Sequence, residues 1–436
     1  MLKRKIMNEL LQWKESVNRK ALVVTGPRQC GKTTAIRCFG AENYKYVLEI
    51  NFKETPDMEE IFRGNLDVDT LIMGMQFRFP DTVIDPRKTL IFLDEIQECA
   101  EAITSLKFWT EDHRYDVICS GSLLGIDYNR ASSYPVGYVD YIHMHSMDFE
   151  EYLWAVNVTA EMIQQLRSFF DAKRPVPQAV NAEMMKQFRI FNAIGGMPEA
   201  VQKYTDTKDM REVHRIQNDL LTGYRYDIAH YASASVKVKA EQCYFSIAKQ
   251  LTEKENHKFQ YSVVEKGSSA RKFENSTDWL TAADIAFKSI RVNRISLFPE
   301  DYEDPSGFRL YTTDIGMLTG MRDFSFKQAV VENTLVMNSK GGFWEAAVAD
   351  ALYKNGYSLH FYKNETSSKR EINFLIVREG KLVPVEVKGG NTSAVSLNAL
   401  MKNSPELPYA FKLADANIGV SEHRVITVPL YMAMFI

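Results

Sequence analysis

The sequence lacks the features that mark several classes of protein. Its five cysteines are an odd number and include no Cys-x-x-Cys pair, which excludes a disulfide scaffold and a cysteine-based zinc site. No stretch approaches the roughly 18–20 uninterrupted apolar residues that a membrane-spanning helix requires. The net charge of −3 provides no overall basic field that would attract nucleic acid. We therefore expect a soluble cytoplasmic protein with reduced thiols and no membrane contact.

The chain is long enough for several domains, because 436 residues exceed what one hydrophobic core usually organises. Its first part alternates short apolar runs with helical stretches, which favours an α/β domain with a mostly parallel sheet. The apolar runs that we expect to be strands cover residues 21–26, 44–52, 89–95, 115–122 and 139–147.

The pattern changes after about residue 148. Apolar residues then recur at helical spacing, and strand signals are missing up to about residue 235. From residue 341 a helix and a strand precede two further apolar runs that meet at Glu379-Gly380, a hairpin signal. The sequence therefore predicts a helical region in the middle and a second α/β unit at the C-terminal end.

A phosphate-binding loop is predicted directly after the first strand. Its residues match the pattern G-x-x-x-x-G-K-[ST], in which glycines let backbone N–H groups surround phosphate, lysine reaches the β and γ oxygens, and a hydroxyl contacts Mg²⁺. We assign Lys32 to the phosphates and Thr33 to the metal. The expected nucleotide-binding residues are Gly26, Pro27, Arg28, Gln29, Cys30, Gly31, Lys32, Thr33, Thr34 and Ser120.

Two acids end the apolar run at residues 89–95. A buried parallel strand brings such residues to the sheet edge that also carries the phosphate loop. We expect Asp94 to hold Mg²⁺ and Glu95 to act as general base on the attacking water, with Lys32 as the other catalytic residue. Ser120, at the end of the next predicted strand, either contacts the γ-phosphate or belongs to a simple Ser-Gly turn.

Several segments together resemble a prokaryotic AAA-type P-loop ATPase family whose members carry an uncharacterised C-terminal domain. The ATPase part is carried by GPRQCGKTT, LIFLDEIQ, CSGS, PVG and MDFEEYL, and the C-terminal part by GGMPEAV, SARKFENSTDWL, FRLYTTDIGML, GGFWEAAVADAL and VPVEVKGG. The resemblance implies an AAA-type ATPase core (1–150), a helical lid (151–235), a winged-helix-like segment (236–330) and a restriction-endonuclease-like α/β module (331–436). Arg28 and Arg130 are candidates for an arginine that acts on a neighbouring subunit in a homo-oligomer.

The resemblance also implies a second, metal-dependent acidic site in the C-terminal module. The possible site residues are Glu345, Glu371, Asn373, Glu386 and Lys388. Glu386 and Lys388 share one face of a strand, where they would ligate Mg²⁺ and orient water. Where an aspartate is expected, however, the sequence has Asn373, which brings no negative charge to a hard cation. The sequence therefore favours a degenerate, structural or DNA-docking module over an active nuclease.

The sequence predicts an ATP- and Mg²⁺-dependent ATPase that acts as a nucleotide switch on a nuclease-like, DNA-binding C-terminal region. One alternative is a DNA endonuclease gated by ATP, and another is a binding module that nucleotide only stabilises. Lysine and arginine residues of the winged-helix-like segment would face DNA or form a solvated surface: Lys249, Lys254, Lys258, Arg271 and Lys272.

Overall fold

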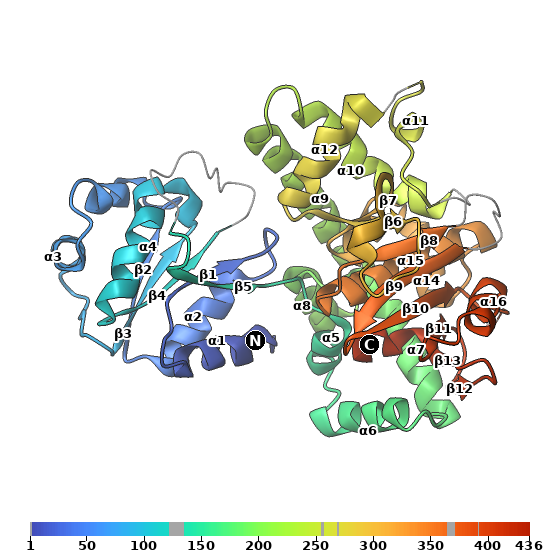
Figure 1. Ribbon diagram of the computed structural model, residues 1–436. Helices are drawn as coiled ribbons and strands as arrows, with labels where there is room; N and C mark the ends of the chain where they lie inside the picture. The colour runs from blue at the N-terminus through green and yellow to red at the C-terminus, as the bar shows by residue number, and fades with distance from the viewer. Residues whose placement is uncertain (1, 122–134, 254–256, 268–269, 364–370, 391) are drawn as a thin grey trace. The chain divides into compact units, whose positions relative to one another are not determined.

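The computed structural model describes residues 2–121, 135–253, 257–267, 270–363, 371–390 and 392–436. The chain divides into two compact units (Figure 1). The N-terminal unit is Arg4–Ser146, and the C-terminal unit is Met147–Ile436 together with Met1–Lys3. Each unit contains its own sheet, so each is described separately.

The N-terminal unit is built on a five-stranded parallel sheet in the order β2-β3-β4-β1-β5. Each strand lies within one of the five apolar runs predicted from the sequence, so the parallel α/β prediction is confirmed. The strands are β1 (Ala21–Thr25), β2 (Tyr46–Asn51), β3 (Thr89–Asp94), β4 (Asp116–Ser120) and β5 (Val139–His143).

Helices cover both faces of this sheet, because alternate side chains of each strand point to opposite sides. Leu22 of β1 and Phe92 of β3 join one core with α1 and α2, whereas Val23 and Ile91 join another core with α3 and α4. The strands therefore read as continuous apolar runs, as buried parallel strands do. The helices are α1 (Ile6–Glu15), α2 (Lys32–Asn43), α3 (Val68–Arg78) and α4 (Ala100–Asp112), with short 3₁₀ turns η1 (Pro56–Phe62) and η2 (Ile96–Glu98).

The C-terminal unit begins with a run of helices, as the sequence predicts. Asp148 caps the first of them through a capping box with Glu151. The helices are α5 (Phe149–Ala155), α6 (Ala160–Asp171), α7 (Gln178–Ile194), α8 (Pro198–Thr207), α9 (Met210–Tyr231), α10 (Lys237–Thr252), α11 (Tyr261–Val264), α12 (Ala270–Ala282), α13 (Ile315–Gly320), α14 (Phe324–Glu332), α15 (Met337–Lys354) and α16 (Val395–Asn403).

The second sheet is mixed and has eight strands in the order β12-β13-β11-β10-β9-β8-β6-β7. Glu379 and Gly380 both have positive φ at the β9–β10 turn, so the predicted hairpin is confirmed. The strands are β6 (Ala286–Val292), β7 (Glu303–Thr312), β8 (His360–Lys363), β9 (Glu371–Arg378), β10 (Lys381–Lys388), β11 (Ala410–Ala414), β12 (Gly419–Val420) and β13 (Val425–Pro429), with 3₁₀ turns η4 (Pro299–Tyr302) and η5 (Leu430–Phe435).

Strands β6 and β7 come from the segment that the sequence analysis describes as winged-helix-like. They pair with each other, and β6 pairs in parallel with β8 of the C-terminal module. The two segments thus share one sheet inside one compact unit. The finer division at residues 235 and 330 stays a prediction.

The sequence GGMP marks a point where backbone segments approach closely. A Cβ atom on Gly196 would lie 1.9 Å from the carbonyl oxygen of Met147, so only glycine fits there. The Gly196 N–H donates to the Asp314 carboxylate at 2.7 Å, and Lys354 Nζ lies 3.6 Å from the same carboxylate. This motif therefore connects α7, α13 and α15 within the core of the C-terminal unit.

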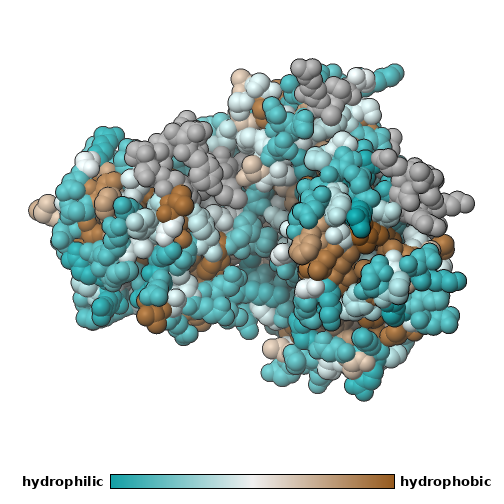
Figure 2. All heavy atoms as spheres, viewed as in Figure 1, coloured by the Kyte–Doolittle hydropathy of each residue, from teal (hydrophilic) through white to brown (hydrophobic). Residues whose placement is uncertain are grey.

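Hydrophilic residues cover most of the surface visible in Figure 2, and the hydrophobic residues in view form separate patches on both units. Within the described residues, none of the helices combines the length and the apolar character that crossing a membrane requires.

Candidate functional site

The predicted phosphate loop connects β1 to α2 in the N-terminal unit. Gly26 and Gly31 have φ of 143° and 98°, values that favour glycine, and a Cβ atom on Gly26 would lie 2.1 Å from the Met144 carbonyl oxygen. Lys32 is the first residue of α2, and its Nζ donates to the carbonyl oxygens of Gly26 and Pro27 at 2.9 Å each. The loop thus places an ammonium group and a helix N-terminus together, which suits an anionic ligand.

Asp94 is the acidic centre of this sheet edge. It is the last residue of β3 and is only 2% exposed. The Thr33 hydroxyl lies 3.0 and 3.1 Å from its two carboxylate oxygens, Asn51 Nδ2 donates at 3.0 Å, and the Ser120 hydroxyl also donates. Burial raises the pKa of Asp94, and the bonds from Ser120 and Thr33 offset only part of that rise. Each of these three donors is neutral, so none balances the charge of the carboxylate.

Glu95 follows Asp94 at the point where the strand ends. Its φ of 54° turns the backbone away from the strand direction, and its carboxylate accepts a hydrogen bond from Gln97 Nε2. The side chain is partly exposed, unlike that of Asp94. A neighbouring amide thus holds Glu95 at the edge of the sheet. Glu95 is not one of the residues that hydrogen-bond to Asp94.

The other predicted nucleotide-binding residues differ in exposure. Pro27 and Cys30 are buried, and the Cys30 thiol donates to the Met144 carbonyl at 3.3 Å. Arg28 is partly exposed, whereas Gln29 and Thr34 are exposed. Arg130, the other candidate for an arginine that acts between subunits, lies outside the described residues.

Two residues near the loop were missed by sequence reasoning. Asn51 lies directly opposite Asp94 in the register of β2 and β3. A polar residue at the carboxyl end of the strand before LIFLDE was the signal that could have found it. Arg4 donates to the carbonyl oxygens of Cys30 and His145 at 2.7 Å each and so ties the loop to the segment after β5. No sequence signal connects Arg4 to the loop.

A cavity of about 480 Å³ lies in the same unit, at the opposite edge of the sheet from the phosphate loop. It is lined by residues at the amino ends of β1 and β4, among them Ala21 and Val117, and by Trp13 and Trp109. It is therefore separate from the predicted nucleotide site.

The C-terminal acidic residues form a second cluster, and Glu345 of α15 is its centre. Glu345 Oε1 accepts from Arg309 Nη1 at 2.8 Å and from the Tyr311 hydroxyl at 2.7 Å. Its Oε2 lies 2.9 Å from His257 Nδ1 and accepts from Asn373 Nδ2 at 2.6 Å. Burial alone would raise the pKa of Glu345, but Arg309 and His257 outweigh it and lower that pKa to about 2.

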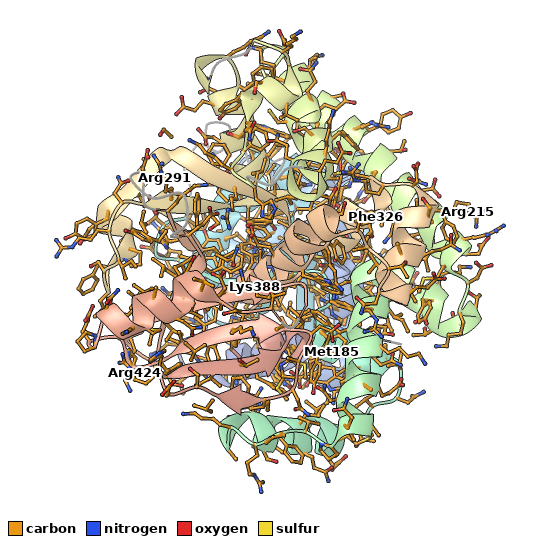
Figure 3. The ribbon with its side chains drawn as sticks, turned by 90° about the vertical axis from the view of Figure 1, so that its right-hand side faces the viewer. Met185, Arg215, Arg291, Phe326, Lys388 and Arg424 are labelled. Atoms are coloured by element: carbon orange, nitrogen blue, oxygen red, sulfur yellow. The ribbon has the colours of Figure 1, made fainter. Side chains whose placement is uncertain are left out.

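The other predicted members of this cluster lie on the hairpin. Glu371 pairs with Arg309 and, at 2.9 Å, with Lys363. Glu386 pairs with Lys388 at 2.7 Å, and burial raises the pKa of Glu386. Lys388 lies near the centre of the view in Figure 3, whereas Arg215 and Arg424 lie at the rim of the C-terminal unit.

The structure therefore brings Glu345, Glu371 and Asn373 together around Arg309, with the Glu386–Lys388 pair on the adjacent strand. Sequence reasoning missed Arg309, Tyr311 and His257, because these residues lie in segments far from the hairpin. Within the part of the chain that the structure describes, no group of three or more histidine, cysteine or acidic residues is arranged to hold a metal ion.

Comparison with known families assigns three segments. Residues 18–153 match the model of the AAA domain, residues 185–328 match a domain of unknown function (DUF8612), and residues 340–431 match another domain of unknown function (DUF4143). A comparison with curated proteins found no match.

Solved structures with similarity to the chain include a Walker-type ATPase, RuvB and ORC1. The Walker-type ATPase PABY2304 of Pyrococcus abyssi is 14% identical over 74% of this chain and 96% of its own, with a TM-score of 0.45. RuvB T158V of Thermotoga maritima is 15% identical over 66% and 89%, with a TM-score of 0.28. Aeropyrum pernix ORC1 in complex with DNA is 10% identical over 76% and 90%, also at 0.28. The assignment therefore depends on the AAA model and the phosphate loop: residues 18–153 form an AAA domain that contains a P-loop.

Proposed function

We propose that the N-terminal unit binds ATP with Mg²⁺ and hydrolyses it. The observation that carries this proposal is the contact between the Thr33 hydroxyl and the buried Asp94 carboxylate, directly beside the phosphate loop and Lys32. Hydroxyl and carboxylate oxygens are the ligands that a small hard cation prefers. The neutral donors around Asp94 leave its negative charge available to such a cation.

In this proposal each residue has one task. The loop backbone and Lys32 bind the phosphates, while Thr33 and Asp94 hold the Mg²⁺, which when bound neutralises charge on the phosphate oxygens. Glu95 accepts the proton of the attacking water, and Ser120 orients Asp94 or the γ-phosphate.

Two substitutions test these roles. Lys32→Ala is expected to abolish ATP binding, whereas Glu95→Gln retains binding and stops turnover. Binding is measured with a fluorescent ATP analogue and turnover by phosphate release. Lys53→Ala, an exposed lysine of the same unit, is the matched control and should behave like the unmodified chain. Undiminished phosphate release in both variants would refute the proposal.

The same assay separates catalysis from nucleotide binding alone. If nucleotide only stabilises the protein, ATP raises the melting temperature and no phosphate is released. The proposed ATPase gives both a higher melting temperature and phosphate release, and Glu95→Gln retains only the first of them.

We further propose that the nucleotide state acts as a switch on the C-terminal unit. Hydrogen exchange of the C-terminal unit should therefore differ between the ATP-bound Glu95→Gln variant and the ADP-bound unmodified chain. Identical exchange in the two states would leave an ATPase without a switch.

DNA and a second copy of this chain are the proposed partners. Turnover measured with and without duplex DNA, over a range of protein concentrations, tests both. If neither duplex DNA nor the protein concentration changes the rate of ATP turnover per molecule, both partners are removed from the proposal.

A further inference from the structure

The acidic cluster of the C-terminal unit contains a cation supplied by the chain itself. We infer that Arg309 occupies the place that a divalent metal would take among Glu345, Glu371 and Asn373, so that this cluster is a metal-free structural centre. The inference concerns a different site from the proposed ATPase and does not depend on it.

Arg309 contacts both acids that a metal ion would bridge. Its Nη1 donates to Glu345 at 2.8 Å and lies 3.5 Å from the Asn373 carbonyl oxygen, and its Nη2 donates to Glu371. The guanidinium thus bridges the helix acid and the strand acid, the two groups between which a shared metal ion would lie. A planar guanidinium suits this task because it donates in several directions at once.

Most of the remaining oxygen atoms of the cluster are also engaged, and among the described residues Glu386 Oε2 is the buried oxygen of the cluster that has no hydrogen-bond partner. Both oxygens of Glu345 accept two hydrogen bonds each, from Arg309, Tyr311, His257 and Asn373. The side-chain oxygen of Asn373 accepts from the Val387 N–H at 2.9 Å. A hard cation takes about six oxygen ligands, so a metal would have to displace most of these bonds.

The charges of the cluster are balanced by side chains of the chain itself. Glu345 and Glu371 pair with Arg309, Glu371 also pairs with Lys363, and Glu386 pairs with Lys388. Three carboxylates therefore face three cationic side chains: Arg309, Lys363 and Lys388. The negative charge that would attract a divalent ion is already neutralised within the chain.

Burial holds the Arg309 side chain in this position. The Arg309 side chain is 1% exposed, and its guanidinium carbon lies 4.4 Å from the centre of the Phe361 ring. Moving the guanidinium aside for a metal would leave a buried cation without its partners, which is costly. Arg309 is therefore a fixed part of the core and not a side chain that yields to an entering ion.

The test is a melting experiment without nucleotide, with and without millimolar Mn²⁺. In the unmodified full chain, any shift of the melting temperature with Mn²⁺ should come from the proposed Asp94 site and should be the same in Glu345→Gln. Arg309→Met should melt at a lower temperature, and Mn²⁺ should recover part of the loss, because three carboxylates then face only two cationic side chains. In the double variant R309M/E345Q this recovery should disappear.

Two outcomes would overturn the inference. One is that the unmodified chain binds Mn²⁺ and that Glu345→Gln or Glu386→Gln abolishes this binding. Binding is measured from the electron paramagnetic resonance signal of Mn²⁺. The other is an Arg309→Met chain that folds but does not respond to Mn²⁺, since the arginine would then not be what excludes the metal. The first measurement needs only the unmodified chain and the two glutamine variants, so it decides the matter even if Arg309→Met fails to fold.

Discussion

The two units each bury a carboxylate at a cluster of polar side chains, and the neighbours of the two carboxylates differ. Asp94 and Glu345 are both 2% exposed. Asp94 accepts hydrogen bonds from two hydroxyls and an amide, all neutral, whereas Glu345 accepts from a guanidinium, a phenol, an imidazole and an amide. Burial is the largest influence on the pKa of both acids and raises that of Asp94, whereas in Glu345 Arg309 and His257 together outweigh burial and lower the pKa.

This difference shows how the partners of an acid indicate what it can do. A buried carboxylate surrounded by neutral donors retains a net charge that a bound cation can balance. A buried carboxylate paired with arginine is already balanced, and its pair contributes to folding. The same residue type thus suits a ligand site in one unit and a structural role in the other.

The largest expected effect concerns catalysis and contrasts the two acids directly. Asp94→Asn should reduce ATP hydrolysis by at least about 10²–10³-fold, the usual cost of removing a group that stabilises developing charge. Glu345→Gln should leave turnover per folded molecule unchanged. Phosphate release by the two purified variants, with folding checked by circular dichroism, provides the comparison. Equal losses in both variants would contradict the division of roles.

The next effect concerns the stability of the C-terminal unit. Arg309→Met removes the cation that Glu345 and Glu371 share and should lower the free energy of unfolding by about 3–5 kcal/mol. Arg215→Met is the matched control: its ion pair with Glu212 is at the surface, the arginine is 67% exposed, and about 0–1 kcal/mol is expected. Urea unfolding gives both values. Similar losses of unfolding free energy in the two variants would show that Arg309 stabilises the unit no more than a surface ion pair does.

The pH dependence of stability should also distinguish Glu345. Its native pKa of about 2 lies below the ordinary value of 4.5, so its contribution to stability is complete above about pH 4.5 and is lost as pH falls toward 2. Glu345→Gln should therefore be less stable than the unmodified chain at pH 7, by on the order of 2–4 kcal/mol. The difference in unfolding free energy between the two proteins should become smaller in unfolding curves recorded at decreasing pH. A difference that does not change with pH would indicate packing instead of charge.

The smallest effect concerns the positioning of Asp94. Asn51→Ala removes one hydrogen bond to the carboxylate and should lower kcat about tenfold, with little change in KM, because one such bond is worth about 1–2 kcal/mol. Asn43→Ala, in which the lost amide donates only to the Phe39 carbonyl, should leave kcat unchanged. Steady-state kinetics of both variants test this, and equal kcat values would assign Asn51 no part in the site.

Local patterns were sufficient to predict much of the fold. Continuous apolar runs predicted the parallel strands, and the pair Glu379-Gly380 predicted the hairpin turn, since both signals lie within a few neighbouring residues. The proximity of Thr33 to Asp94 followed from the rule that parallel strands end at one edge. The same rule would have identified Asn51, which ends the adjacent strand.

Contacts between distant segments could not be predicted in this way. Arg309 lies 36 residues from Glu345 and 62 from Glu371, and its strand belongs to a segment that the pattern separates from the C-terminal module. An arginine in an apolar strand gives no indication of which acid it will meet. The metal-dependent interpretation of the acidic residues rested on the family resemblance and on the hairpin that carries Glu386 and Lys388, without knowledge of this cation.

The pairing of β6 with β8 has a consequence for the inheritance of this chain. The segments 185–328 and 340–431 match separate family models, yet each supplies strands to a single sheet, and β7 of the former supplies the guanidinium that the acids of the latter require. A gene that lost or exchanged one segment would leave an unpaired strand edge in the other, and loss of the segment 185–328 would also leave the buried Glu345 without its arginine. Recombination between related genes is therefore expected to preserve the junction around residue 335 and to transmit both halves as a single heritable block.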